Sequence, residues 1–222
     1  MGYTHYWHRP RTISDDLWER IRGDFEKLIL PLSDAGVELA GGLGTGPPEI
    51  TGDVIRFNGP KDCGHPANEE LVIPYPSDEA EGVGSSLGAI DGDYYGMGVT
   101  IKHRCCNGSC CYETFELEES LDLHSEPTED GLYCGHVKTA FRPYDVAVTA
   151  VLLIAKRYLG NQFVIHSNGG DPQWADARRI CQQVLGYGDW FGIVEESVVD
   201  EWPKRREIIL HSLIEMRAPE LG

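Results

Sequence analysis

The chain has 222 residues and a formal net charge of −17, because 36 acidic residues outnumber 19 basic ones. Binding a nucleic-acid backbone needs a concentrated positive surface, so this composition argues against nucleic acid as the main partner. The apolar runs are far shorter than the roughly 20 residues of a membrane-spanning helix, and no apolar signal segment follows Met1. We therefore expect a cytoplasmic protein without membrane association. The length allows one domain with a substantial core.

The N-terminal part predicts a strand, a helix, a loop and a second strand. Residues 3–7 are rich in β-forming side chains, and Ser14 is a typical residue before the first turn of a helix. Glycines and prolines fill residues 36–48, so we predict a loop there. Residues 54–57 form the next predicted strand. A surface insertion without regular structure is expected at about 60–97.

A β-hairpin is predicted around Asn107-Gly108, which is the strongest two-residue hairpin signal. Its strands are residues 99–106 and 109–117. Closing this turn places Cys105 directly opposite Cys110. Because side chains alternate between the two faces of a strand, these two cysteines share one face of the hairpin.

The cysteines of this hairpin suggest a zinc site. Seven cysteines without a secretion signal favour reduced thiols or metal over a disulfide framework. The predicted register puts Cys106 and Cys111 on the opposite face, so the four hairpin thiols cannot all bind one ion. A disulfide between Cys105 and Cys110, or a pair of packed thiols, is the alternative to metal. The predicted ligands are Cys105, Cys110, His103, Cys134 and His136, with Cys63 and His65 as further candidates.

Residues 132–167 predict a strand, a polar turn, a buried helix and another strand. Pro143 suits the first position of a helix, and Asp145 follows within the positive first turn. Residues 146–155 are almost continuously apolar, which indicates a helix covered on more than one side. Gly160 is the predicted stop of this core helix.

The polar turn before the core helix is the place where we expect chemistry. Both signs of charge occur there and on the neighbouring hairpin, which suits the binding and polarisation of a small anionic or carbonyl ligand. A buried structural ion-pair network is the alternative. The predicted catalytic residues are Glu113, Lys138, Arg142 and Asp145.

The turn that follows the last strand of this stretch is a second candidate. It leads into a helix N-terminus, which favours anions, although ordinary strand-to-helix turns have the same composition. Its predicted ligand-binding residues are Ser167, Asn168 and Gly169. The candidate general bases His5, His8 and His166 lie in predicted strands, where a histidine more often has a structural role.

The remaining segments predict an acidic loop insertion at about 118–131, a third helix from Asp171 to Gly186 and a last helix after Pro203. Helices and strands in this order predict an α+β fold with a mixed or antiparallel sheet. The leading topology is a split β-α-β arrangement, as in a ferredoxin-like plait. We expect a single domain over residues 1–222.

Several short motifs recur along the chain in a combination that carries a resemblance. They are residues 1–7, 57–59, 113–115 and 138–145 and the pair His166-Ser167. By these motifs the chain resembles a family of uncharacterised phage and bacterial proteins that begin with MGYTHYW. The cysteine-rich turn departs from the pattern of that family. The resemblance implies relatives rather than an activity, and it implies the cytoplasm of a host cell, or alternatively a virion, as the location.

Three functional hypotheses follow from these residues. The first is a protein, with or without catalysis, that binds a nucleotide or phosphorylated metabolite in the mixed-charge pocket. The second is an acidic module that binds a basic protein through residues 116–130 and 78–81. The third is a structural zinc-binding protein. The sequence leaves the oligomeric state open.

Overall fold

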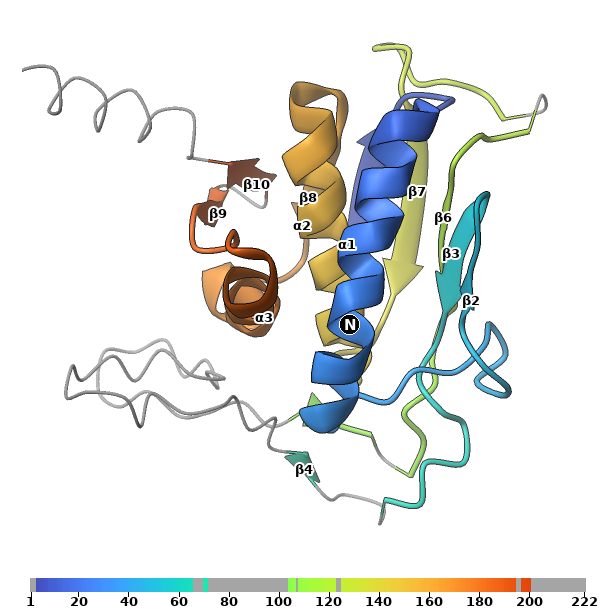
Figure 1. Ribbon diagram of the computed structural model, residues 1–222, viewed down its shortest axis with the longest axis vertical. Helices are drawn as coiled ribbons and strands as arrows, with labels where there is room; N and C mark the ends of the chain where they lie inside the picture. Colours follow the sequence, from blue (N-terminus) through green and yellow to red (C-terminus); the bar gives the residue numbers. More distant parts are fainter. Residues whose placement is uncertain are drawn as a thin grey trace, which may run out of the picture.

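The computed structural model describes residues 3–65, 70–71, 104–106, 108–122, 125–194 and 197–200. In this part of the chain three α-helices pack with antiparallel sheets (Figure 1), so the predicted α+β class is confirmed. The strand expected at 99–103, most of the 60–97 insertion, the acidic stretch 78–81 and the helix after Pro203 lie outside these residues.

The helices are α1 (Asp15–Asp34), α2 (Asp145–Leu159) and α3 (Ala175–Leu185). Short 3-10 helices follow α2 at Gly160–Gln162 and precede α3 at Asp171–Trp174. The strands are β1 (Thr4–Arg9), β2 (Glu49–Ile50), β3 (Val54–Phe57), β4 (Glu70–Leu71), β5 (Arg104–Cys105), β6 (Phe115–Glu118), β7 (Tyr133–Lys138), β8 (Val164–Ser167), β9 (Phe191–Val194) and β10 (Ser197–Asp200).

The largest sheet contains five strands in the order β7-β1-β8-β10-β9, and each neighbouring pair is antiparallel. Strands β7 and β8 therefore run parallel on either side of β1, and α2 connects them. This is the predicted split β-α-β unit. Strands β8 and β9 likewise run parallel on either side of β10, and α3 connects them. Among the described residues the complete β-α-β-β-α-β order of a ferredoxin-like plait does not occur, because α1 leads into a second sheet instead of back to the first.

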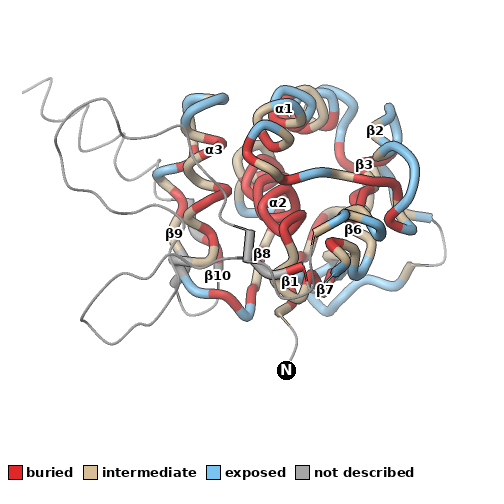
Figure 2. Tube along the Cα trace, turned by 90° about the horizontal axis from the view of Figure 1, so that it is seen from below, coloured by how far each residue is buried: buried red, intermediate tan, exposed pale blue. Residues whose placement is uncertain are grey.

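The three helices lie on one side of the five-stranded sheet (Figure 2). Helix α2 is the innermost, and every residue from Val146 to Ala155 is buried, as its apolar sequence predicts. The helix begins at Asp145 rather than at Pro143, and Gly160 follows its last residue as expected. No described helix has the apolar length that crossing a membrane requires.

The second sheet, in the order β2-β3-β6, is joined to the rest of the core by a chain of aromatic rings. Phe25 on α1 stacks on Phe57 with ring centroids 5.3 Å apart, and Phe57 contacts Phe115 at 5.0 Å. Phe115 in turn lies 5.4 Å from Trp7 on β1. Gly135, opposite Trp7 on β7, leaves room for the indole, because a Cβ there would lie 2.4 Å from it. Truncating such a buried ring to alanine costs about 3–5 kcal/mol.

A buried arginine attaches the start of the acidic insertion to the five-stranded sheet. Arg9 on β1 is 2% exposed, and its guanidinium donates to the carbonyl oxygens of Glu118, Glu119 and Arg11. Burial lowers the pKa of Arg9 to about 10, although the nearby carboxylates of Glu118 and Glu119 oppose this shift. The N–H donors of one side chain therefore organise a strand end and the beginning of a loop.

Asp24 connects α1 to two other parts of the helical layer. Its carboxylate accepts hydrogen bonds from the hydroxyls of Tyr158 and Tyr187, each at 2.6 Å, and from the Lys27 ammonium at 2.6 Å. Burial alone would raise the pKa of Asp24, but these three donors together hold the pKa below its ordinary value.

Because the folded-state pKa of Asp24 is depressed, its contribution to stability is present above the unfolded pKa of about 3.9. That contribution should disappear as the pH falls through the lower folded pKa. We expect Asp24→Asn to flatten the acid limb of a plot of unfolding free energy against pH, measured by urea denaturation between pH 3 and 6. An unchanged acid limb would contradict this role for Asp24. Asp16→Asn, at an exposed position of the same helix, is the control.

A candidate metal centre

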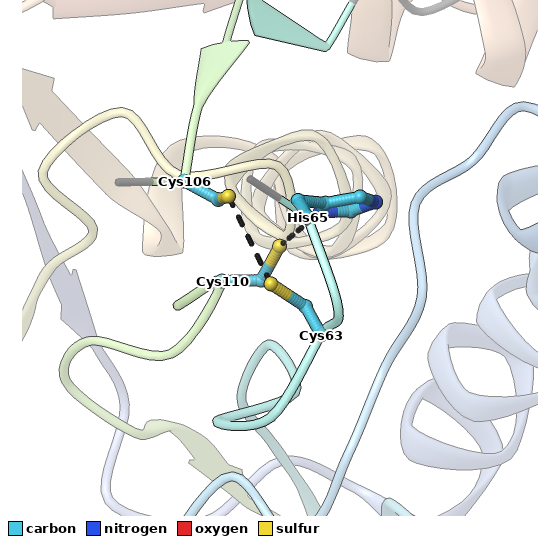
Figure 3. A group of neighbouring side chains, drawn as sticks. All are labelled: Cys63, His65, Cys106 and Cys110. Atoms are coloured by element: carbon cyan, nitrogen blue, oxygen red, sulfur yellow. Dashed lines mark hydrogen bonds between the residues drawn. The ribbon is translucent and has the colours of Figure 1, made fainter. Parts of the chain in front are cut away.

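Four potential metal ligands meet beside the two-stranded sheet of β4 and β5, from segments far apart in the sequence (Figure 3). Cys63 and His65 lie in the chain that follows β3. Cys106 directly follows β5, and Cys110 lies in the chain that leads to β6. One ligand atom from each residue lies within 4.8 Å of all the others.

The distances between these ligand atoms match a tetrahedral site. Zn–S bonds of about 2.3 Å at tetrahedral angles separate two sulfurs by about 3.8 Å, and a sulfur and a nitrogen by about 3.6 Å. The Cys63 and Cys106 sulfurs are 3.8 Å apart. The Cys110 sulfur is 3.4 Å from Nδ1 of His65. Two of the six edges are therefore close to the lengths that a zinc ion requires, and the other four are no longer than 4.8 Å.

The backbone around Cys110 is held by the end of β3. The Cys110 N–H donates to the carbonyl oxygen of Pro60 at 3.0 Å. Gly59 packs directly on the carbonyl group of Cys110, since a Cβ on Gly59 would lie 2.1 Å from the Cys110 carbonyl oxygen. A larger residue at 59 would push the two ligand segments apart.

The buried side chain of Asn58 completes this attachment. Its amide nitrogen donates to the carbonyl oxygens of Gly42 and Tyr112, at 3.1 and 3.0 Å. Its amide oxygen accepts the N–H groups of Gly59 and Tyr112. One fully hydrogen-bonded amide thus connects the glycine-rich loop, the end of β3 and the segment after Cys110.

The predicted hairpin register is wrong, although its turn is present. Ser109 N–H donates to the carbonyl oxygen of Cys106 at 3.0 Å, as expected for a turn over Asn107-Gly108. Beyond that turn Cys105 pairs with Glu70 on β4 instead of with Cys110. The N–H of Cys110 donates instead to the carbonyl oxygen of Pro60, which lies outside the hairpin. Cys106, assigned by the register to the other face, therefore lies beside Cys110 in the cluster.

Of the predicted ligands only Cys110 belongs to this cluster, together with the further candidates Cys63 and His65. Cys134 and His136 are exposed on β7, in the five-stranded sheet. His103 lies outside the described residues, and the structure describes the backbone of Cys105 but not its side chain. Two spacings in the sequence could have identified the cluster: Cys-x-His at residues 63–65 and Cys-x-x-x-Cys at residues 106–110.

The thiols of the cluster are poorly solvated. Cys106 and Cys110 are 1% and 3% exposed, whereas Cys63 is half-buried. Burial raises the pKa of Cys110, and the neighbouring thiols raise it further. Burial acts in the same direction on Cys63, but hydrogen bonds from the His65 backbone and from Cys110 lower its pKa overall. A bound cation would stabilise all three thiolates together.

The predicted mixed-charge set is split between the interior and the surface. Asp145 is fully buried, and its Oδ1 lies 2.8 Å from Nε2 of His5 and accepts the Thr139 hydroxyl at 2.6 Å. Glu113 is exposed and accepts the backbone N–H of Lys138 at 2.7 Å. These two carboxylates therefore serve different parts of the structure.

The two cations of the set are half-buried near the surface. The Lys138 ammonium lies 6.0 Å from the centre of the Tyr112 ring. Ala140 and Phe141, in the turn before Arg142, both have positive φ angles, of 49° and 57°. Such backbone strain in non-glycine residues is common at functional sites. Asp145 is fully buried whereas these two cations are half-buried, and the pocket of four charged residues stays a prediction.

The turn at Ser167, Asn168 and Gly169 is occupied by bonds within the chain. The N–H of Asn168 donates to the carbonyl oxygen of Thr4, and the N–H of Gly169 donates to the Ser167 hydroxyl. Trp174 Nε1 also donates to that hydroxyl, at 3.2 Å. The N–H groups expected to bind an anion are therefore satisfied by protein oxygens.

These bonds also determine the orientation of His5. Because Ser167 Oγ accepts two N–H groups, its own hydrogen is directed to Nδ1 of His5, which lies 3.0 Å away. The ring hydrogen is then on Nε2 and faces Asp145. The residues His5, Asp145, Ser167 and Thr139 form a buried polar network that sequence analysis did not identify.

The Cys63, His65, Cys106 and Cys110 cluster is the candidate site that the described residues support best. Four protein ligands leave no coordination position for a substrate, as is typical of structural zinc sites. Sulfur and imidazole donors suit zinc better than magnesium or calcium, which prefer oxygen. Comparisons with protein-family models, with curated proteins and with solved structures find no match to this chain.

Proposed function

We propose that this protein is a zinc-binding protein whose metal has a structural role. The observation that carries the proposal is the meeting of one imidazole and three thiols within 4.8 Å of one another, with two of the distances close to tetrahedral edges. A disulfide would bring two sulfurs to about 2.05 Å. The 3.8 Å between Cys63 and Cys106 fits a shared ion instead.

The position of the cluster indicates what the metal stabilises. Strand β4 begins five residues after His65, and β5 ends immediately before Cys106. Each strand has two residues, and an isolated two-stranded ladder is marginal in water. A zinc ion at the base of β4 and β5 would bind their two segments together and close the chain between residues 65 and 106.

Metal analysis combined with cysteine mapping tests this proposal. Protein dialysed against metal-free buffer should retain zinc, and Cys63, Cys106 and Cys110 should resist alkylation by iodoacetamide. A strong chelator should remove the zinc and expose these three thiols. Cys111 should react with or without chelator, and the fully buried Cys181 should stay protected in both states.

The contrast between chelated and untreated protein separates metal protection from burial. Zinc-free protein whose three thiols show the same alkylation before and after chelation would overturn the proposal. A mass increment for a Cys63–Cys106 crosslink in freshly purified, unoxidised protein would also contradict it.

A further inference from the structure

The three thiols of the metal cluster differ in their access to solvent. Cys63 is half-buried, whereas Cys106 and Cys110 are 1% and 3% exposed. A small oxidant that arrives from solvent therefore meets the sulfur of Cys63 first. Reversible oxidation is selective for cysteines that are accessible and that have a second thiol beside them. Cys63 satisfies the first of these two conditions.

The second condition is satisfied by Cys106. The sulfurs of Cys63 and Cys106 are 3.8 Å apart and face each other in the cluster (Figure 3). A disulfide has a sulfur separation of about 2.05 Å, so the two rotatable side chains have to approach by roughly 1.8 Å. The sulfur of Cys110 is engaged with the ring of His65, 3.4 Å from Nδ1.

A disulfide between Cys63 and Cys106 would join the same two segments that a zinc ion joins. Cys63 precedes β4 in the chain, and Cys106 directly follows β5. Oxidation of this pair therefore keeps the base of β4 and β5 closed. It leaves His65 and Cys110 as the remaining ligands, which is fewer than the three or four protein ligands of zinc sites. The oxidised cluster should accordingly release its ion.

We propose that the zinc centre is also a redox-sensitive site, at which a hydroperoxide converts Cys63 and Cys106 into a disulfide and zinc is released. This inference rests on the zinc centre of the proposed function. Zinc holds its cysteine ligands as thiolates, and the thiolate is the form of cysteine that reacts with peroxides. The ion would thus stabilise β4 and β5 in the reduced protein and leave when the protein meets an oxidant.

The oxidation takes place in two displacement steps. The Cys63 thiolate attacks one oxygen of hydrogen peroxide, so that an S–O bond forms, the O–O bond breaks and hydroxide leaves. The Cys106 thiolate then attacks the sulfur of this sulfenic acid, an S–S bond forms, the S–O bond breaks and a second hydroxide leaves. The two sulfurs together lose two electrons, which reduce the peroxide to hydroxide. Zinc has no redox chemistry and departs as the same divalent ion.

Peroxide-dependent release of zinc from the full-length, zinc-loaded protein provides the test. The reduced protein is treated with a few equivalents of hydrogen peroxide in the presence of a zinc-sensitive dye, and its disulfides are mapped by mass spectrometry without added reductant. One equivalent of zinc should enter solution together with one Cys63–Cys106 crosslink. Cys110 should become reactive toward iodoacetamide. Dithiothreitol with added zinc should reverse all three changes.

Two variants separate this pathway from general oxidation. Cys106→Asp keeps an oxygen ligand for zinc but removes the thiol that attacks Cys63, so dimedone should trap a sulfenic acid at Cys63 and the crosslink should be lost. If this variant binds no zinc, the disulfide map of the wild-type protein decides the question. Cys111→Ser is the matched control, because Cys111 is half-buried like Cys63 but lies outside the cluster. It should release zinc as the wild type does.

Zinc that stays bound while the exposed Cys134 is oxidised would overturn the redox-sensitive site. A crosslink of Cys63 to Cys110 in place of Cys106 would also overturn it. Both outcomes leave the zinc centre itself intact, because zinc is present in the protein before peroxide is added. Reduced protein that contains no zinc at the start would instead contradict the proposed function, and this inference with it.

Discussion

Replacing Cys110 with serine should remove one equivalent of zinc and lower the melting temperature markedly. A ligand present at 1,000 times its dissociation constant contributes about 4 kcal/mol to folding stability. For a chain of this size, 1 kcal/mol corresponds to about 2–4 °C, so we expect a decrease of roughly 8–16 °C. Elemental analysis and differential scanning calorimetry measure the two effects on the same sample.

Cys111→Ser is a matched control for Cys110→Ser. The two cysteines are neighbours in the sequence, but only Cys110 belongs to the cluster. The Cys111 side chain instead lies against Gly44 in the glycine-rich loop. We expect Cys111→Ser to retain its zinc and to melt within a few degrees of the wild type. If both serine variants lost the same amount of zinc, the ligand assignment would be wrong.

Replacing Asp145 with alanine should cost roughly 3–5 kcal/mol of unfolding free energy. The substitution leaves the Nε2–H of His5 and the hydroxyl of Thr139 without their buried acceptor. Neither group can reach water easily, because His5, Thr139 and Asp145 are all fully buried. Urea denaturation followed by tryptophan fluorescence measures the loss.

Glu113→Ala is the comparison for Asp145→Ala. It removes the exposed carboxylate of the predicted charged set instead of the buried one. Glu113 is exposed and accepts one backbone N–H, so its removal should change the unfolding free energy by about 0.5 kcal/mol or less. A comparable loss in both variants would mean that the two carboxylates belong to one charged unit, as the mixed-charge pocket requires. The buried network around Asp145 would then be the wrong description.

Local sequence patterns were sufficient for the main elements of the fold. Ser14 marks the start of α1, and Gly160 and Gly186 mark the ends of α2 and α3, because helix termini depend on residues within one or two turns. The continuous apolar run of α2 predicted a helix buried on all sides, and the structure confirms it. These properties follow from short-range backbone and side-chain preferences.

The sites depend on contacts between distant segments, which local patterns do not determine. The hairpin rule put Cys106 and Cys110 on opposite faces, but the two lie together in the cluster, where the N–H of Cys110 donates to the distant Pro60. The predicted charge at Asp145 was correctly located at the start of the core helix. Only the packing of β1 against that helix brought His5 to it, across 140 positions of sequence.

The sequence by itself therefore determined the α+β class, the ends of α2 and α3 at Gly160 and Gly186, and the buried character of α2, since each of these depends on neighbours in the chain. It placed the start of α2 two residues early, at Pro143, and the start of α3 four residues early, at Asp171. The tertiary structure decided which thiols meet and which carboxylate is buried. The physical reason is that a ligand set or a buried hydrogen bond is selected by the free energy of the whole packed chain. Long-range partners that satisfy buried polar groups outweigh the preferences of a local turn.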